Sequence, residues 1–334
     1  MQRHFLQSDE WLSFQESQGN QTFSIKKENY EIYAVLKKTS MGNYIYCPYG
    51  PNLEDEEALA QAISDLKDLA KKTNSFFVRV EPTLQIDAEK MKRIGFVKSF
   101  GLNPKATWVL DLDIDEKDLL KGIEKERTRY WRGREKRGMT IRVSKDPADV
   151  DILFNFLKAC ADENNWVGES KEYLIEELSQ DFAMLYILEL HKGDNESGAK
   201  THKGDDESSA ENGEGECIPL AASLMFDDGD TRFYGHSANS PEPAHRKFRA
   251  NGVLLVQAIL DAKAAGKKHF DFWGITLSED KNHPWAGFTK FKKSFSGRPV
   301  IYTGTWDLPV NKVKFSTYQS LRKINRAFRR LLYH

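Results

Sequence analysis

Cysteine, long hydrophobic runs and net charge are all scarce in this sequence, and each shortage excludes a class of protein. The three cysteines, Cys47, Cys160 and Cys217, form no CxxC pair and no histidine-spaced cluster, which argues against a zinc site and a disulfide framework. No apolar run is long enough to span a bilayer, and the polar start MQRHFLQSDEWLSFQES lacks the apolar core of a signal peptide. We therefore expect a soluble cytoplasmic protein without a bound metal.

The net charge of −1 means that any attraction to a polyanion has to come from local patches of the chain. The length of 334 residues is too great for one ordinary domain, so two domains are the natural expectation. A hydrophobic content of 40% is sufficient to build a full core.

The first part of the chain alternates strands and helices. An amphipathic helix is predicted at 53–73, with Leu59, Ile63 and Leu66 on one face, and a short helix ends at Gly95-Phe96. The predicted strands are 32–38, 44–50, 76–82 and 107–112. This order is that of acyltransferases of the GNAT type.

The same order recurs in the second part, where the basic loop HRKFRANG opens a long helix at 253–266. The other predicted elements there are a helix at 148–164, a second around 173–178, and strands at 183–190, 218–226, 231–238 and 268–275. We therefore predict a mixed α/β fold with two tandem GNAT-like domains, 1–138 and 139–311. A C-terminal helix over 312–334 is expected to pack back on the first domain.

The segment 191–216, HKGDNESGAKTHKGDDESSAENGEGE, contains a near-duplicate and separates two predicted strands. One interpretation is a metal or partner site that uses His191, His202 and the aspartates. The other is a disordered acidic insertion at a hairpin tip, which the Gly- and Ser-rich composition explains fully and which we favour.

The motif RANGVL lies at the start of the long helix, where free amide groups and the helix dipole favour anions. Arg249 and Gly252 match the first part of the R-x-x-G-x-G/A loop of coenzyme A-dependent GNAT enzymes, but the third position is Leu254. A leucine that projects there should crowd the pyrophosphate, which argues against acyl-CoA as the donor.

The stretch HPWAGFTKFKKSFSG, 283–297, places three lysines around Phe291. Taken alone, it is typical of a solvated lysine patch beside a hydrophobic plug. The chain as a whole, however, resembles the FemABX family of peptidoglycan bridge-forming aminoacyltransferases from about Tyr49 to Asn311. The motifs that carry this resemblance are YGPNLEDEEAL, FFVRVEP, NPKATWVLDLDIDEKDLLKGIEKERTRYWRGREKRGM, YGHSAN, VLLVQAILDAKAAGKKHFDFWGI and HPWAGFTKFKKSFSGRPVIYTGTWDLPVN.

The resemblance implies that Phe291 and Lys292 lie at the reacting centre. An amine that attacks the ester of an aminoacyl-tRNA builds negative charge on the carbonyl oxygen, and a fixed ammonium beside an aromatic wall stabilises that charge. The family uses aminoacyl-tRNA as donor and no cofactor. Substrate-binding roles are implied for Lys27, Tyr234, Arg249, Trp273 and Lys290.

Two departures from the family leave the acceptor open. Some members that act on a nucleotide-linked muropeptide have an aromatic residue where this chain has Gly252, and an arginine where it has Leu185. A lipid-linked precursor is therefore as plausible as UDP-MurNAc-pentapeptide. The chain is also too short for the coiled-coil arm that other members carry.

Two basic segments are candidates for contact with a polyanion. Residues 120–145 have Lys and Arg in more than threefold excess over acidic residues, with Tyr130 and Trp131 interleaved, and 312–334 has seven Lys or Arg and no acidic side chain. Three interpretations are open for each segment. It forms an amphipathic helix with a solvated cationic face, it contacts phosphates of the tRNA, or it makes a peripheral contact with anionic lipid. The tRNA contacts are assigned to Arg129, Arg132 and Arg134.

We therefore expect a monomeric enzyme that moves an amino acid from aminoacyl-tRNA to a side-chain amine of the peptidoglycan stem peptide. The alternatives are an acyl-CoA-dependent N-acyltransferase and a catalytically silent protein that binds tRNA or a cell-wall precursor. The Phe291-Lys292 pair argues against the silent protein, whereas Gly252 and Leu185 leave it open.

Overall fold

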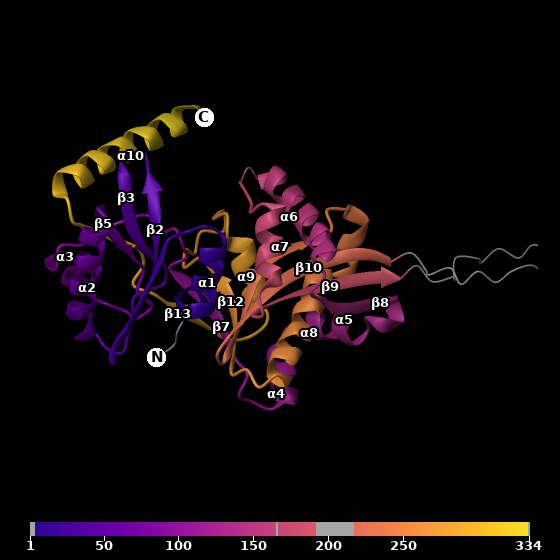
Figure 1. The fold of residues 1–334 in the computed structure, drawn as a ribbon. Helices are drawn as coiled ribbons and strands as arrows, with labels where there is room; N and C mark the ends of the chain where they lie inside the picture. The colour runs from indigo at the N-terminus through magenta and orange to yellow at the C-terminus, as the bar shows by residue number, and fades with distance from the viewer. Residues whose placement is uncertain (1–3, 165, 192–216, 333–334) are drawn as a thin grey trace, which may run out of the picture. The chain divides into compact units, whose positions relative to one another are not determined.

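The computed structural model describes residues 4–164, 166–191 and 217–332 (Figure 1). The predicted acidic insertion therefore lies, apart from His191, outside the described residues. The chain divides into two compact units. Unit 1 contains Met1–Val109, Trp273–Lys290 and Arg298–His334, and unit 2 contains Leu110–Phe272 and Phe291–Gly297. The domain boundary near Gly138 stays a prediction.

The first sheet belongs to unit 1 and has the strand order β1-β2-β3-β5-β14-β6, with β4 paired to β2. These strands are β1 (Thr22–Lys26), β2 (Tyr30–Thr39), β3 (Gly42–Cys47), β4 (Asn52–Leu53), β5 (Ser75–Val80), β6 (Val97–Lys98) and β14 (Trp306–Pro309). The accompanying helices are η1 (Phe5–Gln7), α1 (Asp9–Ser17), α2 (Ala58–Lys72), α3 (Ala88–Arg93) and α10 (Lys312–Leu332).

The second sheet has the order β13-β7-β12-β11-β10-β9-β8. Its strands are β7 (Ala106–Asp111), β8 (Met139–Ser144), β9 (Ala183–His191), β10 (Cys217–Asp228), β11 (Thr231–Asn239), β12 (His269–Gly274) and β13 (Arg298–Ile301). The remaining α-helices are α4 (Glu116–Gly122), α5 (Lys125–Arg132), α6 (Val150–Asn164), α7 (Lys171–Ser179), α8 (Ala250–Ala264) and α9 (Ala286–Lys293). Short 3-10 turns are η2 (Glu135–Arg137), η3 (Pro147–Asp149) and η4 (Pro243–Phe248).

Each unit contains a parallel strand pair joined by a helix. In unit 1, β3 and β5 are parallel and α2 connects them, and in unit 2, β11 and β12 are parallel and α8 connects them. This repeat confirms the predicted mixed α/β fold with two GNAT-like units. Among the described helices none forms a coiled-coil arm, and none is long and apolar enough to cross a membrane.

Helix α2 shows how local sequence sets an element's bounds. The predicted helix began at Leu53, but Leu53 pairs with Tyr30 in β4, and α2 begins at Ala58. The Asp55 carboxylate accepts hydrogen bonds from the amides of Glu57 and Ala58, which satisfies donors at the start of the helix. The apolar face of α2 then packs into the core of unit 1, as its spacing predicted.

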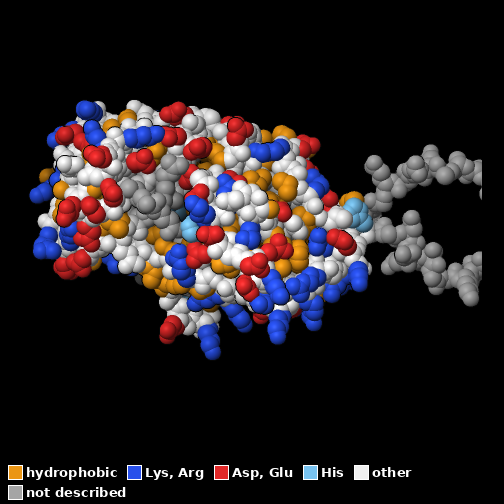
Figure 2. All heavy atoms as spheres, turned by 90° about the horizontal axis from the view of Figure 1, so that it is seen from below, with side chains coloured by type: hydrophobic (Ala, Val, Ile, Leu, Met, Phe, Trp, Pro, Cys, Tyr) orange, Lys and Arg blue, Asp and Glu red, His pale blue; other side chains and the backbone are white. Residues whose placement is uncertain are grey.

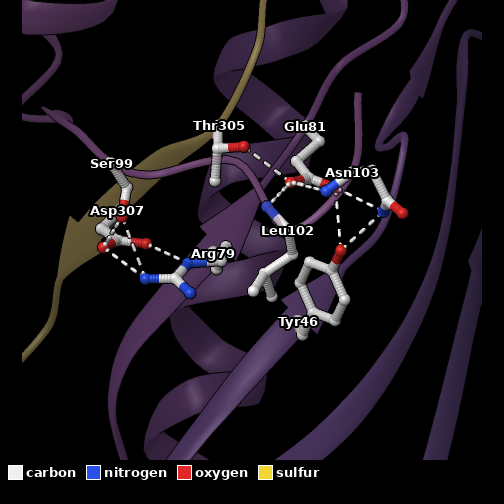
Figure 3. Close-up of polar contacts among 8 residues, drawn as sticks. All are labelled: Tyr46, Arg79, Glu81, Ser99, Leu102, Asn103, Thr305 and Asp307. Carbon is white, nitrogen blue, oxygen red and sulfur yellow. Dashed lines mark hydrogen bonds and ion pairs between the residues drawn. The ribbon is translucent and has the colours of Figure 1, made fainter. Parts of the chain in front are cut away.

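The C-terminal part of the chain completes the first sheet (Figure 3). Arg79 on β5 forms a buried two-point ion pair with Asp307 on β14, with N–O distances of 2.7 and 2.8 Å. Beside it, the buried Glu81 carboxylate accepts hydrogen bonds from Tyr46, Asn103 and Thr305. Because buried charges are stable only when they are paired, these contacts fix residues 305–307 in the sheet.

Helix α10 then packs on the same unit. Phe315 is buried, and its ring centroid lies 5.3 Å from that of Phe77 on β5. Tyr318 contacts both Phe76 and Phe77 with ring centroids 5.4 Å apart.

Candidate active site

The C-terminal end of α9 carries Lys292, the residue implied to act at the reacting centre. Its side chain is largely buried in unit 2, and burial lowers the pKa of Lys292 to about 8, although the negative charge of Asp271 opposes this shift. Asp271 is itself buried on β12. An ammonium with a lowered pKa beside a carboxylate is suited to both charge stabilisation and proton donation near neutral pH.

Aromatic rings form a wall next to this lysine. The ring centroids of Phe291 and Phe295 are 5.3 Å apart, and those of Phe295 and Phe272 are 5.4 Å apart. Phe295 and Phe272 are fully buried, whereas Phe291 is partly exposed. Such a wall lowers the local dielectric constant and strengthens the electrostatic effect of a nearby charge.

Arg127 on α5 lies against the same wall. Its guanidinium carbon is 4.6 Å from the ring centroid of Phe291 and 5.1 Å from that of Phe295. Its Nε donates a hydrogen bond of 2.5 Å to Ser294 Oγ, and the Ser294 carbonyl accepts a bond from the Glu124 amide. The segment that follows Lys292 is thus tied to the start of α5.

Gly252 on α8 leaves the space that this guanidinium occupies. A Cβ atom at Gly252 would lie 2.9 Å from Arg127 Nη1, a distance that real Cβ contacts do not show. Arg127 was not predicted from the sequence, because nothing in a basic segment distinguishes one arginine from its neighbours. The one indication in the sequence was Gly252, where some family members have an aromatic residue. Without an aromatic side chain at this position, another group has to fill the space beside the start of α8.

The start of α8 is held by a polar network. Arg249 has a left-handed φ of 53° at the helix N-cap, and its exposed side chain pairs with Glu126 at 3.3 Å. The buried Tyr234 hydroxyl donates to Ser237 Oγ and also contacts the side-chain amide of Asn251. Two of the implied substrate-binding residues therefore lie at the same helix start, one exposed and one internal.

The expected role of Leu254 is wrong. Its side chain is fully buried in the core of unit 2, so it does not project toward an anion at the helix start. Arg127, packed over Gly252, is the residue that occupies space at this turn.

Strands β11 and β12 separate next to the lysine site. Their parallel pairing ends at Phe233 and Asp271, although β11 continues to Asn239 in contact with β10. The separation therefore begins at the carboxylate that acts on Lys292. A break in pairing between two buried strands leaves backbone groups near the site that are not bonded across this strand pair.

The three arginines predicted to bind tRNA differ in their surroundings. Arg129 and Arg132 are exposed on α5. Arg134 is half-buried, with its guanidinium 5.1 Å from the Trp131 ring and 3.0 Å from Glu135. Figure 2 shows Lys and Arg side chains gathered along one edge of the molecule, over the part of unit 2 that contains α5.

Three implied substrate-binding residues belong to unit 1. Lys27 is exposed in the turn between β1 and β2, and Lys290 is exposed on α9. Trp273 has a left-handed φ of 63°, and its ring packs edge-on against buried His4, with centroids 4.9 Å apart. An aromatic residue with positive φ is uncommon, and such strain is concentrated at functional sites.

No group of three or more His, Cys, Asp or Glu suited to a metal ion occurs among the described residues. The three cysteines form no disulfide with one another.

The fold with two GNAT-like units and the match to a family of aminoacyltransferases indicate a transferase. Residues 1–99 and 186–323 match the FemAB family, and the chain belongs to this family, which confirms the predicted relationship. It is 22% identical to aminoacyltransferase FemA of Staphylococcus aureus (strain MRSA252), over 96% of this chain and 94% of that protein.

Solved structures show the same fold. The crystal structure of FemX has a TM-score of 0.76 at 18% identity, with 94% of each chain covered. The C-terminal domain of a putative lysylphosphatidylglycerol synthetase from Agrobacterium fabrum has a TM-score of 0.51 at 13% identity, with 90% of this chain and 88% of that chain covered.

Proposed function

We propose that this protein transfers an amino acid from aminoacyl-tRNA to a side-chain amine of the peptidoglycan stem peptide during cross-bridge synthesis. Membership of the FemAB family and similarity to an aminoacyltransferase support this activity. The observation that carries the proposal is Lys292, which follows Phe291 at the end of α9, is largely buried, has a pKa lowered to about 8 and is influenced by the charge of Asp271.

In the proposed reaction the acceptor amine, in its neutral form, attacks the carbonyl carbon of the aminoacyl ester. The C–N bond forms, and negative charge develops on the carbonyl oxygen. The C–O bond to the ribose then breaks, and a proton from the attacking nitrogen ends on the ribose oxygen. The Lys292 ammonium stabilises the developing charge and donates the proton to the leaving oxygen, and Lys292 then regains a proton from the attacking nitrogen.

We propose that the aromatic wall beside the end of α9 keeps the Lys292 ammonium in a fixed position. Phe291 and Phe295 exclude water on one side, and Arg127 holds both rings through its guanidinium plane. Preorganised charge of this kind acts without reorganisation during the reaction. We therefore assign Lys292 and Phe291 to the reacting centre and Arg127 to its support.

Exposure supports the proposed contacts of Arg129 and Arg132 with tRNA phosphates and of Lys27, Arg249 and Lys290 with donor or acceptor. Tyr234 is buried and Trp273 is half-buried, so their proposed substrate contacts rest on the family resemblance. We propose that the enzyme works as a monomer without a cofactor beyond the donor. The acceptor is either the lipid-linked or the nucleotide-linked precursor.

A transfer assay tests this proposal. Purified protein is incubated with labelled aminoacyl-tRNAs and each precursor in turn, and label is followed into the peptide. Transfer to the stem peptide supports the proposal. Transfer from acetyl-CoA, with thermal stabilisation by acetyl-CoA, would favour an acyl-CoA enzyme instead. Binding of tRNA or precursor without transfer from any donor would favour the silent protein.

A further inference from the structure

Two cation-rich segments of unit 1 contain no acidic side chain. Residues 90–105 carry five Lys or Arg, residues 312–332 carry seven, and neither segment has an Asp or Glu. They meet in the fold, because the Arg322 guanidinium carbon lies 5.7 Å from the ring centroid of Phe100. This ring contact brings the two segments together on unit 1, where Lys90 pairs with Glu56 and Lys92 with Glu89, so that Arg93, Lys98 and Arg322 are the cations nearest to the contact that the proposal uses.

The same two segments expose apolar side chains. Within six residues, Val97, Phe100 and Leu102 are 38%, 55% and 54% exposed, and Leu321, next to Arg322 on α10, is 46% exposed. Single exposed hydrophobic residues are ordinary, but a group of them bordered by cations marks an interaction surface. We call these four residues, together with Arg93, Lys98 and Arg322, the basic apolar patch.

The backbone beneath the patch is fixed by the polar network of unit 1 (Figure 3). Ser99 donates its hydroxyl to Asp307 and its amide to the Thr305 carbonyl, and the Leu102 amide points to Glu81 at 3.3 Å. The polar groups of the loop are thus directed inward, and the Phe100 and Leu102 side chains are left outside. A loop fixed in this way presents apolar groups to a partner at little further entropic cost.

We propose that the basic apolar patch docks unit 1 on an anionic lipid surface. Lys and Arg side chains near such a surface are attracted to its negative potential, while exposed aromatic and aliphatic groups enter the interfacial layer. An RNA partner explains the cations but not Val97, Leu102 and Leu321, because aliphatic side chains gain little against a phosphate backbone. This docking rests on the proposed function and deepens it, because it brings the enzyme to a lipid-linked acceptor.

Vesicle sedimentation of the full-length protein, without donor or acceptor, tests the docking alone. Wild-type protein should bind vesicles of phosphatidylglycerol and phosphatidylcholine, bind pure phosphatidylcholine weakly, and release as salt rises. The triple variant R93Q/K98Q/R322Q should lower the partition coefficient about fivefold per cation, or about 100-fold in total. The control K67Q/K71Q/K72Q removes the same charge from α2 and should change it less than about twofold.

A second pair of variants tests the apolar contribution. F100S/L102S should lower binding at least about tenfold, including at high salt, where the charge contribution is screened. I114S removes an exposed apolar side chain from unit 2 and should have no effect. Circular dichroism and melting temperatures establish that each variant is folded. The charge variants and the apolar variants test the basic apolar patch independently of each other.

Three results would overturn the proposal. The first is an absence of binding by wild-type protein to anionic vesicles at low salt. The second is an equal loss in the α2 control, which would show that only net charge matters. The third is a loss of tRNA affinity in the patch variants with unchanged vesicle binding, which would assign the surface to RNA. None of these depends on transfer activity, so docking and the proposed function fail separately.

Discussion

The guanidinium carbon of Arg127 lies 4.6 Å from the ring centroid of Phe291, the residue that precedes Lys292. The same guanidinium fills the space above Gly252 and is hydrogen-bonded to Ser294. One side chain therefore joins α5, the start of α8 and the end of α9. Its guanidinium lies where a Cβ atom at position 252 would be, and it packs on two rings of the aromatic wall.

Replacing Arg127 with lysine should impair transfer more than substrate binding. Lysine lacks the planar group that covers both rings and bonds to Ser294, a contribution of about 1–2 kcal/mol at a half-buried site. We expect kcat to fall about 10-fold or more, with little change in KM for the acceptor. Steady-state kinetics measure both, and Lys125→Arg, at an exposed position of the same helix, is the control.

A pH profile separates this positioning role from general destabilisation. A loosened wall admits water to Lys292, so its pKa should rise from about 8 toward the ordinary value of 10.5. The falling limb of the rate profile should move to higher pH in Arg127→Lys. An unchanged limb in a variant with reduced kcat would show that Arg127 does not act through Lys292.

Lys292→Met should reduce turnover by orders of magnitude, because the ammonium is needed mainly in the transition state. Acceptor binding should remain close to that of wild type. In the wild-type enzyme the rate should fall as pH rises through about 8, where Lys292 loses its proton. A folded Lys292→Met variant that transfers at nearly the wild-type rate would remove this residue from the mechanism.

The same substitution should stabilise the protein at neutral pH. Burial lowers the pKa of Lys292 in the folded state to about 8, whereas the unfolded chain titrates near 10.5. Below pH 8 both states are protonated, and the folded state carries the full cost of the buried ammonium. Lys292→Met should therefore be more stable by about 1–3 kcal/mol below pH 8, and the difference should shrink between pH 8 and 10.5. Urea denaturation across this range measures it.

The ion pair between Arg79 and Asp307 should be essential to unit 1. Both side chains are almost fully buried, so Asp307→Asn leaves a guanidinium without its charge partner and should cost about 3–5 kcal/mol of the free energy of unfolding. Asp68→Asn, which breaks the exposed pair with Lys71, is the control and should change stability little. Equal effects in the two variants would contradict a structural role for the buried pair.

Short-range sequence patterns predicted many of the helices and strands. The features that they did not predict depend on contacts between residues far apart in the sequence. The apolar spacing of α2, the long apolar run of α8 and the strands between helices were evident in sequence, because each is a local pattern. The placement of β14 in the first sheet was not, since it depends on Asp307 meeting Arg79 228 residues away. Arg127 was missed for the same reason: its partners, Phe291 and Gly252, become neighbours only in the folded chain.

The affinity for aminoacyl-tRNA should fall steeply with salt, and individual arginines of α5 should contribute unequally. Arg129 and Arg132 are exposed, so Arg129→Gln and Arg132→Gln should each flatten the slope of log K against log salt by about one unit. Arg134 is already engaged by Trp131 and Glu135, so Arg134→Gln should change the slope less. The effects should be the same for every tRNA sequence, because backbone contacts carry no base information. Filter binding between about 50 and 200 mM salt measures the slopes. A slope that none of the three variants alters would place the phosphate contacts elsewhere on the protein.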